Sequence, residues 1–89
     1  MFHQQQARFR EAREGYAKAL TLARASGGEE DVARTLNNLG ILHRAENRMG
    51  DARQAFEEAL KIYRTFAQIS PAAYEPYVKK VQGNLDALP

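Results

Sequence analysis

The chain has 89 residues, of which 44% are hydrophobic and 27% are charged, so it fits one small globular domain and is too short for a large catalytic fold. Cysteine is absent, which excludes disulfides and thiolate metal sites, and no apolar run approaches the roughly 18 residues of a membrane helix. Thirteen Lys and Arg against eleven Asp and Glu give a net charge of +2, which argues against electrostatic binding of nucleic acid.

Apolar residues recur at helical spacing in four successive segments, and the alternation typical of strands is absent from the sequence. The first segment covers about residues 3–25, and Gly27 or Gly28 can end it because glycine accepts a left-handed backbone. The second segment begins with three acidic residues, 29–31, whose carboxylates complement the positive end of a helix dipole.

Asn47 marks the turn into the third segment, since Asn is one of the few residues other than Gly that adopts the left-handed conformation. We expect the fourth helix to run from about Pro76 to residue 88, because Pro76 has no amide hydrogen and disfavours helical backbone at Glu75. Pro71 and Pro76 then belong to a linker that precedes this helix.

The chain repeats itself. A shift of forty residues superimposes 1–24 on 41–64 with seven identities, and a shift of 46 lays the fourth segment on the second, for example Asn38 on Asn84. Periods of 20–50 residues are typical of helical solenoids. Ala7 stands where the next repeat has Asn47, which predicts a single rod over about 3–25; a frayed stretch at 1–6 is the equally weighted alternative.

The segment TLNNLGILHR (35–44), followed by NRMGDARQAFEEALKIYR (47–64), resembles a tetratricopeptide repeat, and the LNNLG form with its long period is similar to the repeats of kinesin light chain. The resemblance implies an all-α superhelix of about four antiparallel helices. One complete repeat, about 32–66, is flanked by two partial ones. Residues 1–89 are then a single domain, expected to be a fragment of a longer array. His43 departs from the family pattern, because an aromatic residue is usual there.

Small residues predict where neighbouring helices touch. Gly40, Ala52 and Ala59 have the family's spacings of twelve and seven, and two helices approach closely only where one side chain is nearly absent. We therefore expect Gly40 to face an Ala or an aromatic residue, so that Phe56 can cover both helices, with packing that offsets the cost of about 1 kcal/mol of a glycine within a helix.

The sequence offers little for catalysis. His3 and His43 occupy the same repeat position, which favours a partly buried packing role for His43. No His and carboxylate share a helix face at metal-binding spacing, and Gly27-Gly28 lacks the Lys and Ser or Thr that a phosphate loop requires. We expect no enzyme activity, no metal and no cofactor. The start, MFHQQQ, has no apolar core of a secretory signal, so a cytoplasmic location is expected.

Binding of a protein is the favoured function. The resemblance implies that the first helix of each repeat lines a concave groove. There a cation and an Asn four residues apart, on one helix face, occur in both the second and the fourth helix. Such residues can bind an extended peptide backbone and a carboxylate, although the two Asn residues can also hydrogen-bond within the array while Arg34 is solvated. The predicted peptide-binding residues are Arg34, Asn37, Asn38, Ile41, Arg44, Lys80 and Asn84.

Self-association is the alternative. Without polar terminal caps, apolar surface is expected at both ends of the array, on Tyr16, Leu20, Val78, Val81 and Leu85. A second copy of the chain, or a longer parent protein, would cover that surface.

Overall fold

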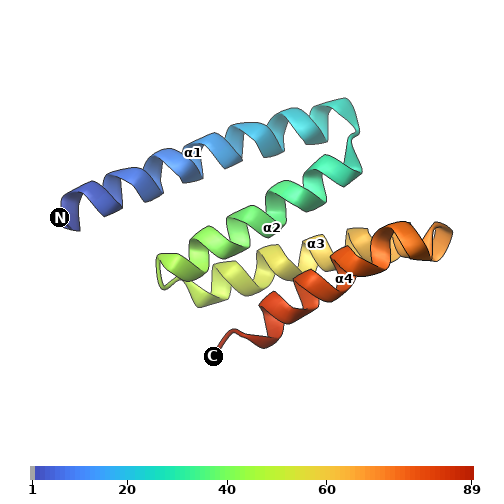
Figure 1. The fold of residues 1–89 in the computed structure, drawn as a ribbon. Coiled ribbons are helices and arrows are strands. Elements are labelled where there is room, and N and C mark those ends of the chain that lie inside the picture. Colours follow the sequence, from blue (N-terminus) through green and yellow to red (C-terminus); the bar gives the residue numbers. More distant parts are fainter. Residues whose placement is uncertain (1) are drawn as a thin grey trace.

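The computed structural model describes residues 2–89, with side-chain surroundings for residues 7–89. In this part of the chain it has four helices, and no strand occurs there: α1 (Phe2–Ser26), α2 (Glu29–Ala45), α3 (Met49–Ile69) and α4 (Pro71–Asp86). Successive helices run antiparallel and pack in chain order, so that α2 lies between α1 and α3, and α4 packs on α3 (Figure 1). The predicted all-α fold is confirmed.

Two left-handed residues produce the first two turns, as the sequence predicts. Gly27 has φ 74° and Asn47 has φ 63°. In each turn the following amide bonds back to the helix, from Gly28 to the carbonyl of Ala23 at 3.0 Å and from Arg48 to that of His43 at 2.8 Å. This Schellman arrangement satisfies the last carbonyl groups of α1 and α2 and reverses the chain within a few residues.

The first helix is one continuous rod, as expected from Ala7. The turn at Asn47 separates α2 from α3. At Ala7, the corresponding position of the preceding repeat, α1 continues without a break. The best helix-forming residue stands at this point, and no residue with left-handed preference is near it. The N-terminal partial repeat therefore consists of one long helix.

The prediction for the start of α4 was wrong. The helix begins at Pro71, five residues earlier than expected, and only Ser70 separates it from α3. The six additional residues of the second repeat period therefore lengthen the helices instead of forming a linker. Pro71 occupies the first helical turn, where a missing amide hydrogen costs nothing, but Pro76 lies inside the helix.

Aromatic packing offsets the cost of Pro76. Tyr74 stacks on Phe66 of α3 with ring centroids 5.0 Å apart, and Tyr77 stacks on Tyr63 with centroids 5.2 Å apart. Both tyrosines flank Pro76 in sequence, so the helix around the proline is fastened to α3 on either side. Tertiary contacts thus override the local preference that Pro76 sets.

The helices meet at the small residues that the sequence indicates. Phe56, Ala52 and Ala59 are 0% exposed. A Cβ atom at Gly40 would lie only 2.5 Å from Cε1 of Phe56, so the glycine allows the ring to fill the space between α2 and α3. The predicted close approach at Gly40 is confirmed, and the structure gives Phe56 as the residue that faces it.

Apolar residues of α4 are covered, contrary to expectation. Val81 is 1% exposed, and Val78 and Leu85 are half-buried against the core formed with α3. At the other end, Tyr16 and Leu20 are also half-buried. The exposure predicted for Val81 is therefore wrong, and that predicted for Val78 and Leu85 is only partial.

Candidate peptide-binding face

Three of the predicted residues lie along one side of α2. Arg34 is exposed, Asn38 is half-buried and Ile41 is 38% exposed. Their spacings of four and three residues place them in one line along the helix. Opposite them, Leu36 and Gly40 are buried in the core, so this line is the outward side of α2.

On α4, Lys80 and Asn84 lie one turn apart on a common side. Lys80 is exposed, whereas Asn84 is half-buried and its Nδ2 donates to Oδ1 of Asn37 at 3.0 Å. Asn37 is only 7% exposed. The residue that meets Asn84 is therefore Asn37 and not Asn38, its counterpart in the repeat, and the Asn37–Asn84 pair links α2 to α4.

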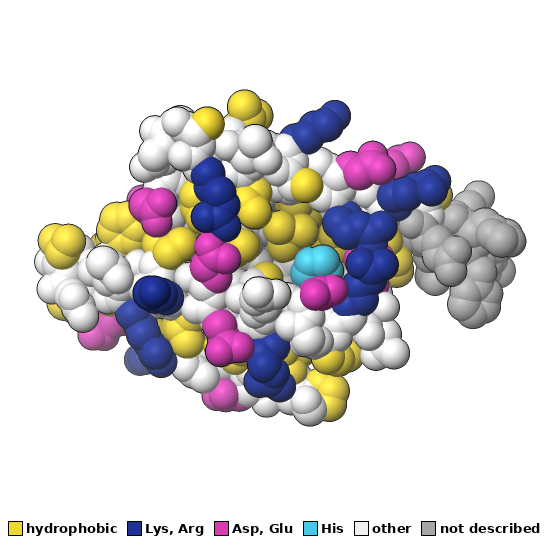
Figure 2. All heavy atoms as spheres, turned by 180° about the vertical axis from the view of Figure 1, so that it is seen from behind, with side chains coloured by type: hydrophobic (Ala, Val, Ile, Leu, Met, Phe, Trp, Pro, Cys, Tyr) yellow, Lys and Arg dark blue, Asp and Glu magenta, His cyan; other side chains and the backbone are white. Residues whose placement is uncertain are grey.

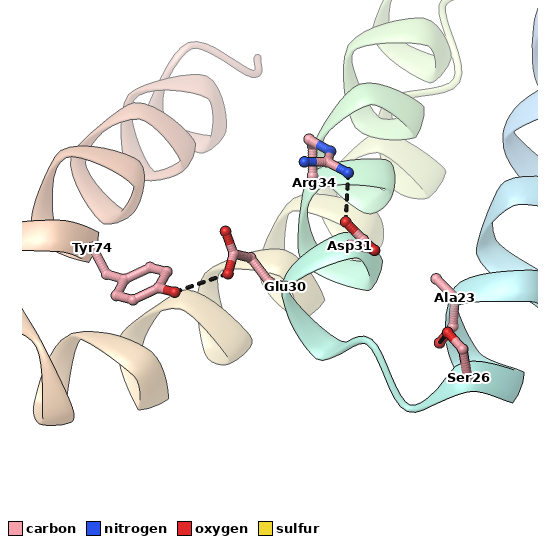
Figure 3. A network of polar contacts seen from close by, with 6 residues as sticks. All are labelled: Ala23, Ser26, Glu30, Asp31, Arg34 and Tyr74. Carbon is pink, nitrogen blue, oxygen red and sulfur yellow. Dashed lines mark hydrogen bonds and ion pairs between the residues drawn. The ribbon is translucent and has the colours of Figure 1, made fainter.

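A second hydrogen bond joins the same two helices near their first turns. The hydroxyl of Tyr74 donates to Oε2 of Glu30 at 2.9 Å, as Figure 3 shows. Together with the Asn37–Asn84 pair, this bond holds α4 beside α2 at two levels. We call the surface formed by Arg34, Asn38, Ile41, Tyr77 and Lys80 the α2–α4 face.

Aromatic residues contribute to this face, which the sequence reasoning missed. Tyr77 is 46% exposed, although its ring stacks on Tyr63 below it, and Tyr74 lies 6.2 Å from Tyr77 between ring centroids. A signal existed in the sequence. Tyr74 and Tyr77 are three residues apart, as are Tyr63 and Phe66, and this spacing lets two helices exchange aromatic contacts.

Two of these phenols are held in the neutral form. Burial raises the pKa of Tyr63 above its ordinary value of 10.0, and the neighbouring Tyr77 adds to this effect while Arg34 opposes it. The hydrogen bond to the Glu30 carboxylate raises the pKa of Tyr74, because loss of its proton removes the donor and brings two negative charges together.

The guanidinium of Arg34 donates to the Asp31 carboxylate three residues earlier, also visible in Figure 3. Both side chains are largely exposed, 65% for Arg34 and 57% for Asp31. An exposed pair of this kind contributes at most about 1 kcal/mol and exchanges readily with another partner. Arg34 is therefore accessible, whereas Arg44 at the far end of the line is half-buried.

Two further features of the described residues are the placement of metal-binding side chains and the distribution of charge. They contain no group of three or more His, Asp or Glu side chains placed to hold a metal ion. His43 is half-buried, as expected, and the side chain of His3 lies outside the described part. Figure 2 shows acidic and basic side chains interspersed over one face of the molecule, with apolar side chains between them.

Two pockets of 330 and 420 Å³ lie along α3. They share Lys61 and Thr65, and neither is lined by any of the seven predicted peptide-binding residues. None of the helices in the described region is both long enough and apolar enough to traverse a bilayer.

Antiparallel helices that pack in chain order around one core, with an internal repeat, define an α-helical repeat protein. The Tetratricopeptide repeat family matches residues 1–65, and the chain belongs to this family. The match spans α1, α2 and most of α3, whereas α4 lies beyond it. No curated protein and no solved structure matches the chain. Tetratricopeptide repeats generally mediate protein–protein interaction and are typically without catalytic activity.

Proposed function

We propose that residues 1–89 form a single non-catalytic domain that binds an extended segment of a partner protein on the α2–α4 face. One observation supports this proposal above the others. Arg34, Asn38 and Ile41 follow the outward side of α2, and two hydrogen bonds join this helix to α4, which carries the exposed Lys80.

Each residue of the face has a distinct role in the proposal. Arg34 and Lys80 attract a carboxylate, from an acidic side chain or a chain end, because both present exposed cations. Asn38 donates to and accepts from the backbone of the bound segment. Ile41 gives an apolar contact, and Arg44 borders the face with a second cation.

Asn37 and Asn84 take a different role from the one predicted. Their side chains bond to each other, so in this proposal they position α4 and leave contact with the partner to the neighbouring residues. Loss of either amide would leave the other without its partner, at a buried position for Asn37 and at a half-buried one for Asn84.

Peptides selected from a random display library on the chain provide the test. We expect the double substitution Arg34→Ala and Lys80→Ala to weaken selected peptides at least about tenfold, since it removes two charge-assisted contacts of about 1.5–3 kcal/mol each. The weakening should shrink as salt is raised.

The matched control is Arg10→Ala with Lys61→Ala, which removes two exposed cations from α1 and α3. This variant should bind the selected peptides as the unmodified chain does. Equal binding by both double variants, or a selection that returns no peptide, would show that the α2–α4 face is not the binding surface.

Self-association through both terminal helices has less support than the sequence suggested. It required apolar surface on α4, but Val81 is buried and Val78 and Leu85 are packed against the core. On α1, Tyr16 and Leu20 are also half-buried against the core, whereas Leu22 is 71% exposed.

A further inference from the structure

Tyr77 presents an exposed aromatic ring on the α2–α4 face. One side of this ring stacks on Tyr63, with the two planes 15° apart and the centroids at 5.2 Å. Tyr63 is only 4% exposed whereas Tyr77 is 46% exposed, so the ring of Tyr77 covers Tyr63 and turns its other side toward solvent. The stack fixes the orientation of the outer ring, and a ring that is already fixed loses little freedom when a ligand packs on it.

Exposed cations of both helices accompany this ring. Burial raises the pKa of Tyr63, Tyr77 raises it further and Arg34 lowers it, so Tyr77 and Arg34 both lie near the Tyr63 hydroxyl. On α4, Lys80 follows Tyr77 by three residues and therefore lies on the same side of this helix. A ligand that packs on the outer side of the Tyr77 ring would therefore meet positive charge from α2 and from α4.

The α2–α4 face is rich in hydrogen-bond donors and poor in acceptors. Arg34 and Lys80 can donate but cannot accept, and Ile41 can do neither. Of the five residues of the face, only Asn38 and Tyr77 have an atom that can accept. The side chains of this face therefore favour a ligand with many acceptors and few donors.

Other acceptors near the face lie at its margin. Glu30 and Asp31 belong to the first turn of α2, and each already accepts one side-chain hydrogen bond (Figure 3). Backbone carbonyls inside a helix bond to amides of the same helix. The carbonyl of Ala72 is an exception because Pro76 has no amide hydrogen, but it is directed toward Pro76, about 100° around α4 from Tyr77.

This balance of donors and acceptors selects the kind of segment that binds. An extended segment of ordinary residues presents one N–H per residue, and an N–H that loses its water without gaining an acceptor costs free energy. Proline has no N–H but keeps its carbonyl acceptor. Successive prolines also favour the polyproline II helix, which is extended before binding, and their rings pack in aromatic-lined grooves.

Charge selects the second component of the segment. Arg34 and Lys80 are both exposed and favour carboxylates. The polyproline II helix has three residues per turn, so acidic residues at every third position lie along one edge and leave the other two edges to proline. One edge of such a segment can therefore face the cations while another packs on the Tyr77 ring.

We infer that the segment bound by the α2–α4 face is rich in proline and carries acidic residues, and that it binds as a polyproline II helix. One proline packs on the outer side of the Tyr77 ring. The acidic side chains pair with Arg34 and Lys80, and a proline carbonyl accepts from the amide of Asn38. This inference rests on the proposed function and names the class of partner for it.

Two labelled peptides test this class of partner by fluorescence anisotropy. One is Glu-Pro-Pro repeated four times, and the other is Glu-Ala-Ala repeated four times, which has the same charge but an N–H at every position. We expect the intact chain to bind the proline peptide with a Kd below about 1 mM and the alanine peptide at least about tenfold more weakly. Peptides selected from the display library should also be enriched in proline.

Substitutions of Tyr77 test the role of its ring. Tyr77→Leu removes the flat aromatic surface but keeps an apolar side chain, so it should weaken the proline peptide at least about tenfold and leave the alanine peptide unchanged. Tyr77→Phe keeps the ring and should bind both peptides as before. The matched control is Ile69→Ala, which removes a side chain that is 79% exposed at the end of α3 and should have no effect. Far-ultraviolet circular dichroism should show equal helix content in all variants.

Equal binding of the two peptides by the intact chain would overturn the inference. If that equal binding falls in the variant with Arg34→Ala and Lys80→Ala, the proposed function stands and only the preference for proline is lost. An unchanged preference in Tyr77→Leu, or a library selection whose peptides lack proline, would also overturn the inference. If neither peptide binds and the library returns no peptide, the proposed function fails together with it.

Discussion

At Gly40 the backbone of α2 comes nearest to α3, and a Cβ atom there would stand 2.5 Å from Cε1 of Phe56. The ring of Phe56 is 0% exposed. A glycine inside a helix ordinarily costs about 1 kcal/mol relative to alanine. At this position the cost is offset, since the absent side chain lets an aromatic ring fill the interface.

We predict opposite effects for two glycine-to-alanine substitutions. Gly40→Ala should lower the free energy of unfolding by about 1–2 kcal/mol, because the overlap with Phe56 exceeds the gain in helix propensity. Gly83→Ala in α4 should raise it by up to about 1 kcal/mol, since a Cβ atom there meets nothing within 4 Å. Urea unfolding followed by circular dichroism measures both. Stabilisation by Gly40→Ala would contradict the close contact.

For other single residues, the sequence predicted the backbone conformation but not the hydrogen-bond partner. The left-handed turn at Asn47 was predictable because the conformation depends on the residue's own backbone preference. The pairing of Asn84 with Asn37 was not. Repeat alignment placed Asn84 on Asn38, but the relative shift of α4 along α2 decides which of two adjacent amides comes within hydrogen-bond distance.

Among the elements, α4 departs most from expectation. Its first five residues precede Pro76, which lacks the amide hydrogen that would bond to the carbonyl of Ala72. The segment is nevertheless helical because Tyr74 stacks on Phe66 and donates to Glu30. The local preference against a helix is smaller than the sum of these tertiary contacts.

Replacement of this proline should therefore stabilise the protein. Pro76→Ala restores a backbone hydrogen bond within α4, and we expect the free energy of unfolding to rise by roughly 1–2 kcal/mol after the entropy gained by the unfolded chain is subtracted. Pro71→Ala is the control. Pro71 lies in the first turn of α4, where an amide hydrogen has no acceptor within the helix, so Pro71→Ala should not raise the free energy of unfolding. A loss of stability in Pro76→Ala would mean that the proline itself orders α4.

The two terminal helices have opposite characters. The outward positions of α4 are Lys79, Gln82 and Asp86, which suit contact with water. The corresponding stripe of α1 is made of small and apolar residues and remains uncovered. The periodicity of apolar residues does not distinguish the outward side of α1 from that of α4, because both helices also carry an apolar side toward the core.

At the scale of the whole molecule, the hydroxyl groups of Tyr63 and Tyr74 make the free energy of unfolding depend on pH in the alkaline range. The folded-state pKa values of Tyr63 and Tyr74 lie above the ordinary value of 10.0, so the folded chain holds these protons more tightly than the unfolded chain does. Their contribution to stability is complete below about pH 10 and is lost as the pH rises through the raised folded-state values.

The urea midpoint should accordingly fall as the pH increases above about 10. The double variant Tyr63→Phe and Tyr74→Phe should show a smaller decrease over the same interval, because its phenylalanines have no proton to lose. Comparison with the unmodified chain at each pH removes the effect of lysine titration. Identical slopes for the two proteins would contradict the shifted tyrosines.

The sequence by itself determined the all-α class, the two left-handed turns and the close approach of two helices at Gly40. These features follow from backbone preferences and from a repeat period, and both can be read in short stretches of the chain. The tertiary structure alone decided the start of α4, the choice of Phe56 as the residue that faces Gly40, the Asn37–Asn84 pair and the aromatic contacts around Pro76. Each depends on how far one helix is displaced along another, which is set by the sum of many packing contacts between residues distant in sequence.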